Sequence, residues 1–245
     1  MTMQIKWTFA KNEGGRESGL HDAGIETFKG NFDRYLAREV IQNSLDARAA
    51  ASKPVKMQFK LRALKRKQIP DLEGLKTSLS RCANYWKQDK KAFKFFSEAE
   101  QLATADEVTA LQVSDFNTTG VRGGDSDRNK DWYNLIRCAG SSPKIGGEGG
   151  SFGIGKNAPF AASRMRTVLY STKTGDGKDA FQGVAILASY AHPDGGIAQS
   201  TGFLGGPRAL QCGRRRAFRR HFAEQKPERT SSCSGFRRQG AGGKT

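Results

Sequence analysis

An early segment, REVIQNSLDARAA at residues 38–50, carries oxygen-bearing side chains at helical spacing. Glu39 and Asn43 are one turn apart, and Asp46 follows three residues later. At about 100° per residue, the three side chains fall within a narrow arc of one helix face. Such oxygens suit Mg²⁺, which binds a few protein oxygens and fills its other coordination positions with water and phosphate. We predict that Asn43 binds magnesium and that Glu39 takes a proton from an attacking water; a solvated polar helix face is the alternative.

A second segment, GGEGGSFGIGK, has six glycines among residues 146–155. Residues 150–156 fit the first part of a P-loop, but Asn157 follows where a magnesium-binding Ser or Thr belongs, and no buried strand precedes it. A surface loop without a ligand is a second interpretation, although six glycines are entropically costly to order. The third is a nucleotide lid whose backbone amides wrap a triphosphate, and this is the interpretation we favour.

A third segment, QVSDFNTTGV at residues 112–121, ends a predicted strand with an acid. Asp115 would then lie at the rim of a pocket, followed by a turn containing Asn117 and Gly120. A carboxylate there can accept a hydrogen bond from an exocyclic amine such as that of adenine. An ordinary Asx-type turn is the alternative.

The surrounding sequence predicts the elements that must position these segments. Helical spacing of Leu36, Val40, Ile41 and Leu45 predicts a helix within residues 31–51, with the last three side chains directed toward a core. Strict alternation over 55–64 predicts a half-buried strand with Val55, Met57, Phe59 and Leu61 on one side.

The remaining elements are predicted in the same way. Residues 71–104 indicate two polar helices, either an insertion or a side layer. Strands are expected at 4–9, 109–116, 166–172 and 181–190, and short helices at 131–140 and 157–164. Helices and strands mix without strict βαβ alternation, which favours an α+β, two-layer α/β sandwich over a doubly wound sheet.

Bulk composition excludes some classes of protein. No run of about 18 apolar residues predicts a membrane helix, and residues 1–15 lack the apolar stretch of a signal peptide. The four cysteines have no metal-type spacing, so buried reduced thiols are expected. We expect a cytoplasmic protein that does not bind membranes.

The net charge of +17 suggests a polyanionic partner, and much of it lies at the end of the chain. Residues 203–245 hold eleven Lys/Arg and two Glu, and lack Ile and Val altogether. This composition predicts a basic tail of low order: either an arm that binds nucleic acid, or a truncated or frameshifted end, which we favour. Residues 1–202 would form the folded domain.

The three segments, in this order, resemble the GHKL ATPase superfamily, which includes gyrase B, the large heat-shock chaperone, MutL, MORC ATPases and sensor histidine kinases. REVIQNSLDA looks like its magnesium-binding helix, VSDFNTTGV like its adenine segment and GGSFGIGKNA like its lid. The resemblance covers about residues 30–190. It implies the Bergerat fold, a mixed sheet with helices over one face and ATP between them.

The resemblance also implies roles for individual residues. Glu39 would be the general base, Asn43 the magnesium ligand, Asp46 a supporting contact, and Asp115 the partner of adenine. Asn117 stands where the family has the first glycine of its adenine turn, and Gly120 comes one residue late. The lid residues expected around the phosphates are Gly150, Ser151, Phe152, Gly153, Ile154, Gly155 and Lys156.

The function implied is ATP binding with slow, magnesium-dependent ATP hydrolysis, coupled to lid closure or homodimerisation. A phosphoacceptor histidine on a helical hairpin is not evident, which argues against the kinase branch. The alternative is a catalytically inactive nucleotide-binding remnant, or a basic nucleic-acid-binding protein.

Overall fold

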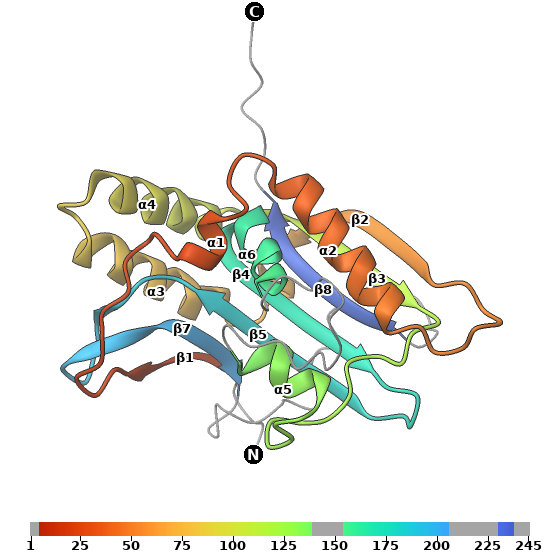
Figure 1. Ribbon diagram of the computed structural model, residues 1–245. Coiled ribbons are helices and arrows are strands. Elements are labelled where there is room, and N and C mark those ends of the chain that lie inside the picture. The colour runs from red at the N-terminus through yellow and green to blue at the C-terminus, as the bar shows by residue number, and fades with distance from the viewer. Residues whose placement is uncertain (1–4, 139–153, 206–229, 238–245) are drawn as a thin grey trace, which may run out of the picture.

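The computed structural model describes residues 5–138 and 154–205 and, for the backbone, the strand at 230–237. Within these residues one eight-stranded sheet is surrounded by helices (Figure 1). The α+β class expected from the sequence is confirmed at this level.

The sheet is antiparallel in every described pairing. Its order is β1-β7-β5-β4-β8-β3-β2, with the short β6 beside β7. The expected mixed sheet is therefore not found in the described residues. Short connections such as the turn between β4 and β5 can join only antiparallel neighbours. The strands are β1 Lys6–Lys11, β2 Lys56–Lys65, β3 Glu107–Phe116, β4 Ser163–Lys173, β5 Asp179–Ile186, β6 Tyr190–Ala191, β7 Ile197–Gly205 and β8 Thr230–Arg237.

The helices match the periodicity of the sequence. The α-helices are α1 Ala23–Glu26, α2 Phe32–Asp46, α3 Leu72–Tyr85, α4 Lys90–Thr104, α5 Asp131–Ile136 and α6 Ala158–Ala162. Two 3₁₀ turns, η1 Arg66–Gln68 and η2 Gly155–Asn157, complete the set. The proline of α6 lies in its first turn, as expected, because a missing N–H is tolerated there.

One face of the sheet, which we call the helix α2 face, is covered by α1, α5 and α6. Val168 and Tyr170 of β4 pack there with Trp132 of α5 and Phe160 of α6. Helix α2 packs on α6 and η2 and lies in front of β8 and β3 in Figure 1.

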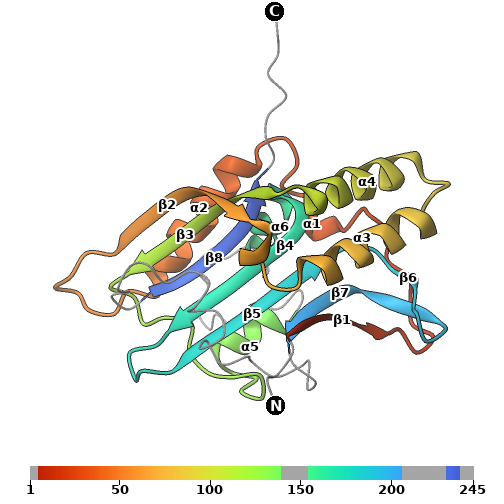
Figure 2. The ribbon, with the colours of Figure 1, turned by 180° about the vertical axis from the view of Figure 1, so that it is seen from behind.

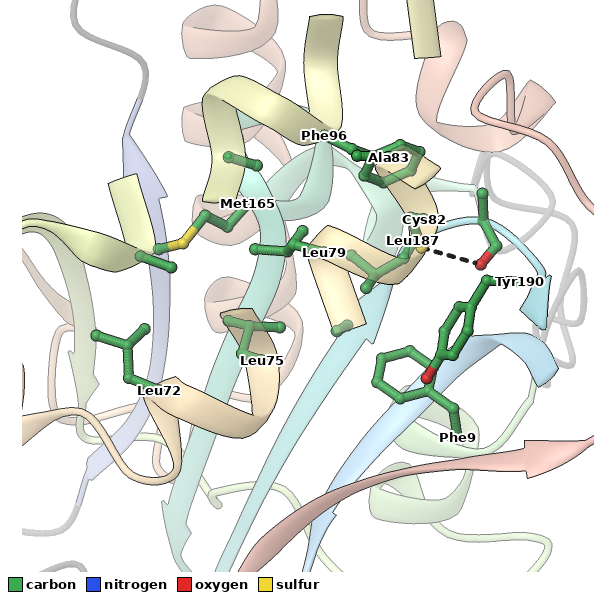
Figure 3. Packing of buried hydrophobic residues seen from close by; sticks show 14 of the residues in the cluster. Phe9, Leu72, Leu75, Leu79, Cys82, Ala83, Phe96, Met165, Leu187 and Tyr190 are labelled. Carbon is green, nitrogen blue, oxygen red and sulfur yellow. Dashed lines mark hydrogen bonds between the residues drawn. The ribbon is translucent and has the colours of Figure 1, made fainter. Parts of the chain in front are cut away.

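The opposite face, which we call the back face, is partly covered by α3 and α4 (Figure 2). Their apolar side chains, including Leu75, Leu79 and Phe96, pack on Met165 and Leu187 of the sheet region (Figure 3). Helices thus cover both faces, and the expectation of helices on one face only is wrong. The physical reason is that α3 and α4 are amphipathic and bury a full apolar stripe.

Cys82 of α3 lies in this back-face cluster as a free, fully buried thiol. It donates to the Ala188 carbonyl oxygen, 3.4 Å away, as Figure 3 shows. Burial raises the pKa of the thiol to about 12, although the hydrogen bond to Ala188 opposes this shift. The expected buried, reduced cysteine is found here.

Some side chains expected in the core are exposed. Ile41 and Leu45 of α2 are 40% and 57% exposed, because the helix buries Leu36 and Ser44 instead. Phe59 and Leu61 of β2 are 43% and 55% exposed. β2 is an edge strand, so the apolar side of its alternation is only partly covered.

The C-terminal region contributes a strand. β8 pairs with β3 on one side and with β4 on the other, inside the segment expected to be a tail of low order. β7 also extends to Gly205. The rest of that segment lies outside the described residues. Among the described helices, none is both long and apolar enough to cross a membrane.

Candidate functional site

The first and second predicted segments meet at Glu39 and Gly155. A Cβ atom placed on Gly155 would overlap the Glu39 carboxylate. The packing of α2 on η2 and α6 brings the two residues together, although 116 positions separate them in the chain. Gly155 is buried and Glu39 is half-buried. The absence of a side chain at Gly155 therefore makes room for the acid.

Asn43 and Asp46 follow Glu39 along the same side of α2. At about 100° per residue, the three side chains span an arc of about 60°. Both Asn43 and Asp46 are exposed. Among the described residues, no hydrogen bond or ion pair engages the side chain of Glu39 or Asn43. An acid and an amide whose side chains have no partner among the described residues thus lie on one side of α2, with the acid against Gly155.

Asp115 lies on the helix α2 face of the sheet. Strand β8 aligns Val113 with Tyr170, and Asp115 with Thr172 of β4. Directly opposite residues of antiparallel strands share a face, and Tyr170 packs on the helix α2 face. Asp115 points in the same direction and is 6% exposed.

The turn after Asp115 is fixed to the end of α2. The Ala49 N–H donates to the Asn117 carbonyl oxygen over 3.0 Å, and the Thr119 N–H to the Ala47 carbonyl oxygen over 2.8 Å. Asn117 has a φ of 62°, a left-handed conformation that Asn tolerates. Its amide nitrogen donates to the Pro54 carbonyl oxygen, so this side chain holds the neighbouring loop.

Thr172 is a member of the site that sequence reasoning missed. Its hydroxyl accepts a 2.8 Å hydrogen bond from the Val121 N–H. Gly120 has a φ of 70°, and a Cβ on it would lie 2.8 Å from the Lys173 carbonyl oxygen. β4 therefore supports the turn that follows Asp115. The sequence carries no signal for this contact beyond a Thr in an apolar strand.

Lys156 is engaged by the end of α5. Its ammonium group donates to the carbonyl oxygens of Asn134 and Cys138. Burial lowers the pKa of Lys156, although the coulombic interaction with the neighbouring Cys138 side chain opposes this shift. The adjacent Asn157 amide lies against Gly24 of α1, where a Cβ would overlap it. The end of the glycine segment is therefore fastened to two neighbouring helices.

The remaining expected lid residues are only partly within the described part of the chain. Gly150, Ser151, Phe152 and Gly153 lie outside the described residues, whereas Ile154 is half-buried at the start of η2. Within the described residues there is no group of three or more His, Cys, Asp or Glu side chains that could hold a metal ion.

The structure thus brings Glu39 against Gly155, ties the Asp115 turn to the end of α2, and directs Lys156 to α5. Comparisons of the sequence with models of protein families and with curated proteins found no match.

Proposed function

We propose that the protein is an ATP-binding domain of the hydrolytic GHKL type, with a Bergerat-type fold. The observation that supports this most directly is the contact between Glu39 and Gly155. It joins the acid–amide helix to the glycine segment on the face toward which Asp115 points. ATP would lie between α2 and the sheet, with the lid segment over its phosphates.

Two α2 side chains would act at the phosphate end. Asn43 would hold Mg²⁺ through its amide oxygen; it fits this role because its side chain has no partner among the described residues and is exposed beside Glu39. When bound, Mg²⁺ supplies charge neutralisation to the phosphates. The Glu39 carboxylate would orient a water molecule and take its proton as the terminal phosphate is attacked.

Asp115 would act at the other end of the nucleotide. Its carboxylate, buried at the end of β3, would accept a hydrogen bond from the adenine amine. Lys156 donates to two carbonyl oxygens of the α5 region; contact with a phosphate would require it to leave them. Turnover would then be slow, because lid rearrangement precedes chemistry.

The proposal is tested by Glu39→Gln, which removes the base and keeps the size of the side chain. We expect magnesium-dependent ATP hydrolysis to fall about 100-fold or more, with ATP affinity changed less than about threefold. Phosphate release and equilibrium binding of ATP are the measurements. Glu100→Gln, a half-exposed acid on α4, is the matched control and should leave both unchanged.

Three results would count against the proposal. Unchanged hydrolysis in Glu39→Gln would remove Glu39 from the chemistry. ATP binding without any hydrolysis by the unmodified protein would support the alternative of an inactive nucleotide-binding remnant. The absence of ATP binding would contradict both the proposed ATPase and the inactive nucleotide-binding remnant.

A further inference from the structure

The back face changes character abruptly along β2 and β3. At one end, Leu64 of β2 and Val108 and Ala110 of β3 are buried against the α3–α4 cluster. Beyond Ala110 the residues of the same face are Gln112, Ser114 and Phe116. In Figure 2, α3 and α4 lie to the right, while β2 and β3 extend past them to the left. This end of the back face has no described helix over it.

This end of the back face is basic. Alternate residues of a strand lie on the same face of the sheet. The back face of β2, on which Leu64 is buried, therefore also carries Lys56, Lys60 and Arg62. Lys56 and Arg62 are exposed and Lys60 is half-buried. Among the described residues, none of the three forms an ion pair. No acidic residue occupies this face between Lys56 and Arg62, or opposite them on β3.

The three cations form a row with defined spacing. A strand rises about 3.4 Å per residue, so Lys60 and Arg62 are about 7 Å apart and the row is about 20 Å long. DNA rises about 3.4 Å per base pair with one phosphate charge per strand. The row therefore matches the length of about six base pairs. Charged side chains, Lys especially, also protect an edge strand from aggregation, so a role in binding needs the polar neighbours and a binding test as well as the charges.

The polar neighbours favour contact with a backbone over stacking on bases. Gln112 accepts from the Arg62 guanidinium over 3.1 Å and donates to the Ser114 hydroxyl. Phe116 has the Lys56 ammonium 5.7 Å from its ring centroid, so its ring is not an open platform. Single-stranded nucleic acid is usually bound by such platforms. Duplex phosphates need only the cations.

We propose that this basic face, formed by Lys56, Lys60 and Arg62, binds the phosphate backbone of double-stranded DNA without reading its sequence. The interaction is separate from the proposed nucleotide site, which lies on the opposite side of the sheet.

The test is a salt series of binding to a labelled 20-base-pair duplex, followed by fluorescence anisotropy on the full chain. A triple variant, Lys56→Gln, Lys60→Gln and Arg62→Gln, is compared with the unmodified protein. Three phosphate contacts contribute a slope of about 2.7 in log affinity against log salt concentration. We expect the slope to become shallower by about 2 to 3, and the affinity at 100 mM salt to fall at least about tenfold.

A matched control removes the same charge elsewhere. Lys87→Gln, Lys90→Gln and Lys91→Gln change three exposed lysines at the connection of α3 and α4. This variant should retain the slope within about 0.5 and the affinity within about threefold. Circular dichroism and thermal unfolding of both variants show whether each is folded.

Three outcomes would overturn the proposal. Equal losses in the two triple variants would mean that total charge, and not this face, determines binding. A duplex affinity unchanged by the β2 variant would remove the face from the interaction. The β2 variant could also lose more affinity for a 20-nucleotide single strand, or for vesicles containing phosphatidylserine, than for the duplex. Either result would assign the face to a different partner.

Discussion

At the scale of single residues, the contact of Glu39 with Gly155 couples two segments of the candidate site that are distant in sequence. A Cβ at position 155 has no space while the carboxylate remains in place. The glycine is therefore required by its neighbour, and not by a left-handed backbone conformation of its own. Loss of the acid should relax that requirement, which makes the contact measurable without any ligand.

We predict that Gly155→Ala lowers the free energy of unfolding by about 1–3 kcal/mol, because the added methyl forces the carboxylate out of its place. In a Glu39→Ala background the same change should cost at least about 0.5 kcal/mol less. Denaturant unfolding of the four proteins measures this coupling. Gly175→Ala, where a Cβ meets nothing within 4 Å, is the control. If the changes in the free energy of unfolding caused by the two substitutions are additive, positions 39 and 155 do not interact and the contact is contradicted.

We also predict that Asn43→Ala weakens ATP binding only when magnesium is present, by about tenfold. The reason is that the variant removes the amide oxygen proposed to bind the ion and leaves the purine end intact. Isothermal titration with MgCl₂ and then with EDTA separates the two conditions. An equal loss in both would show that Asn43 contacts the nucleotide itself, or that it is needed only for the fold.

At the scale of elements, the turn after β3 is held from two sides. The end of α2 pairs with residues 117–119, and β4 presents Thr172 to Val121. Thr172 is 1% exposed, so its hydroxyl cannot be replaced easily by water. The position of Asp115 relative to α2 therefore depends on a strand that is distant in sequence.

We predict that Thr172→Val destabilises the protein by about 1–3 kcal/mol, because the Val121 N–H loses its acceptor in a buried place. Gly120→Ala should cost at least as much, since it adds backbone strain to an overlap with Lys173. Thermal unfolding measures both changes. Thr77→Val, at a more exposed position on α3, is the control. A Thr172→Val protein with unchanged stability would show that the hydrogen bond is dispensable.

Local patterns were sufficient to predict α2, β2, β3 and the α3–α4 pair, because each has a clear period of its own. They were not sufficient to assign faces. The exposure of Ile41 and Leu45 depends on which side of α2 meets α6, and that of Phe59 on β2 being an edge strand. Thr172 and β8 depend on pairings between distant segments. A window of ten residues contains no information about such pairings.

At the scale of the whole molecule, β8 determines the integrity of the sheet. It is the strand between β3 and β4, so among the described strands the two parts of the sheet are joined through it alone. A composition poor in branched aliphatic residues predicted a tail of low order here. The pairing instead relies on backbone hydrogen bonds, which every residue type except proline can make.

We predict that a chain ending at Gly205 loses cooperative unfolding, because β3 and β4 would each present an unpaired edge to solvent. A chain ending at Arg237 keeps β8 and should unfold like the full chain. Differential scanning calorimetry and size-exclusion chromatography of the two variants provide the comparison. A shorter variant with an unchanged unfolding transition would show that β8 does not contribute to stability.

The placement of β8 also determines the order of events during synthesis. Asp115 and Thr172 are both translated well before residue 230, yet the strand that aligns them is made later. A ribosome-bound chain that has not yet released residues 230–237 would hold two separate part-sheets, and the proposed nucleotide site between α2 and the sheet would still be incomplete. The proposed nucleotide binding should then become possible in a single step, only after this strand has been made and has inserted between β3 and β4.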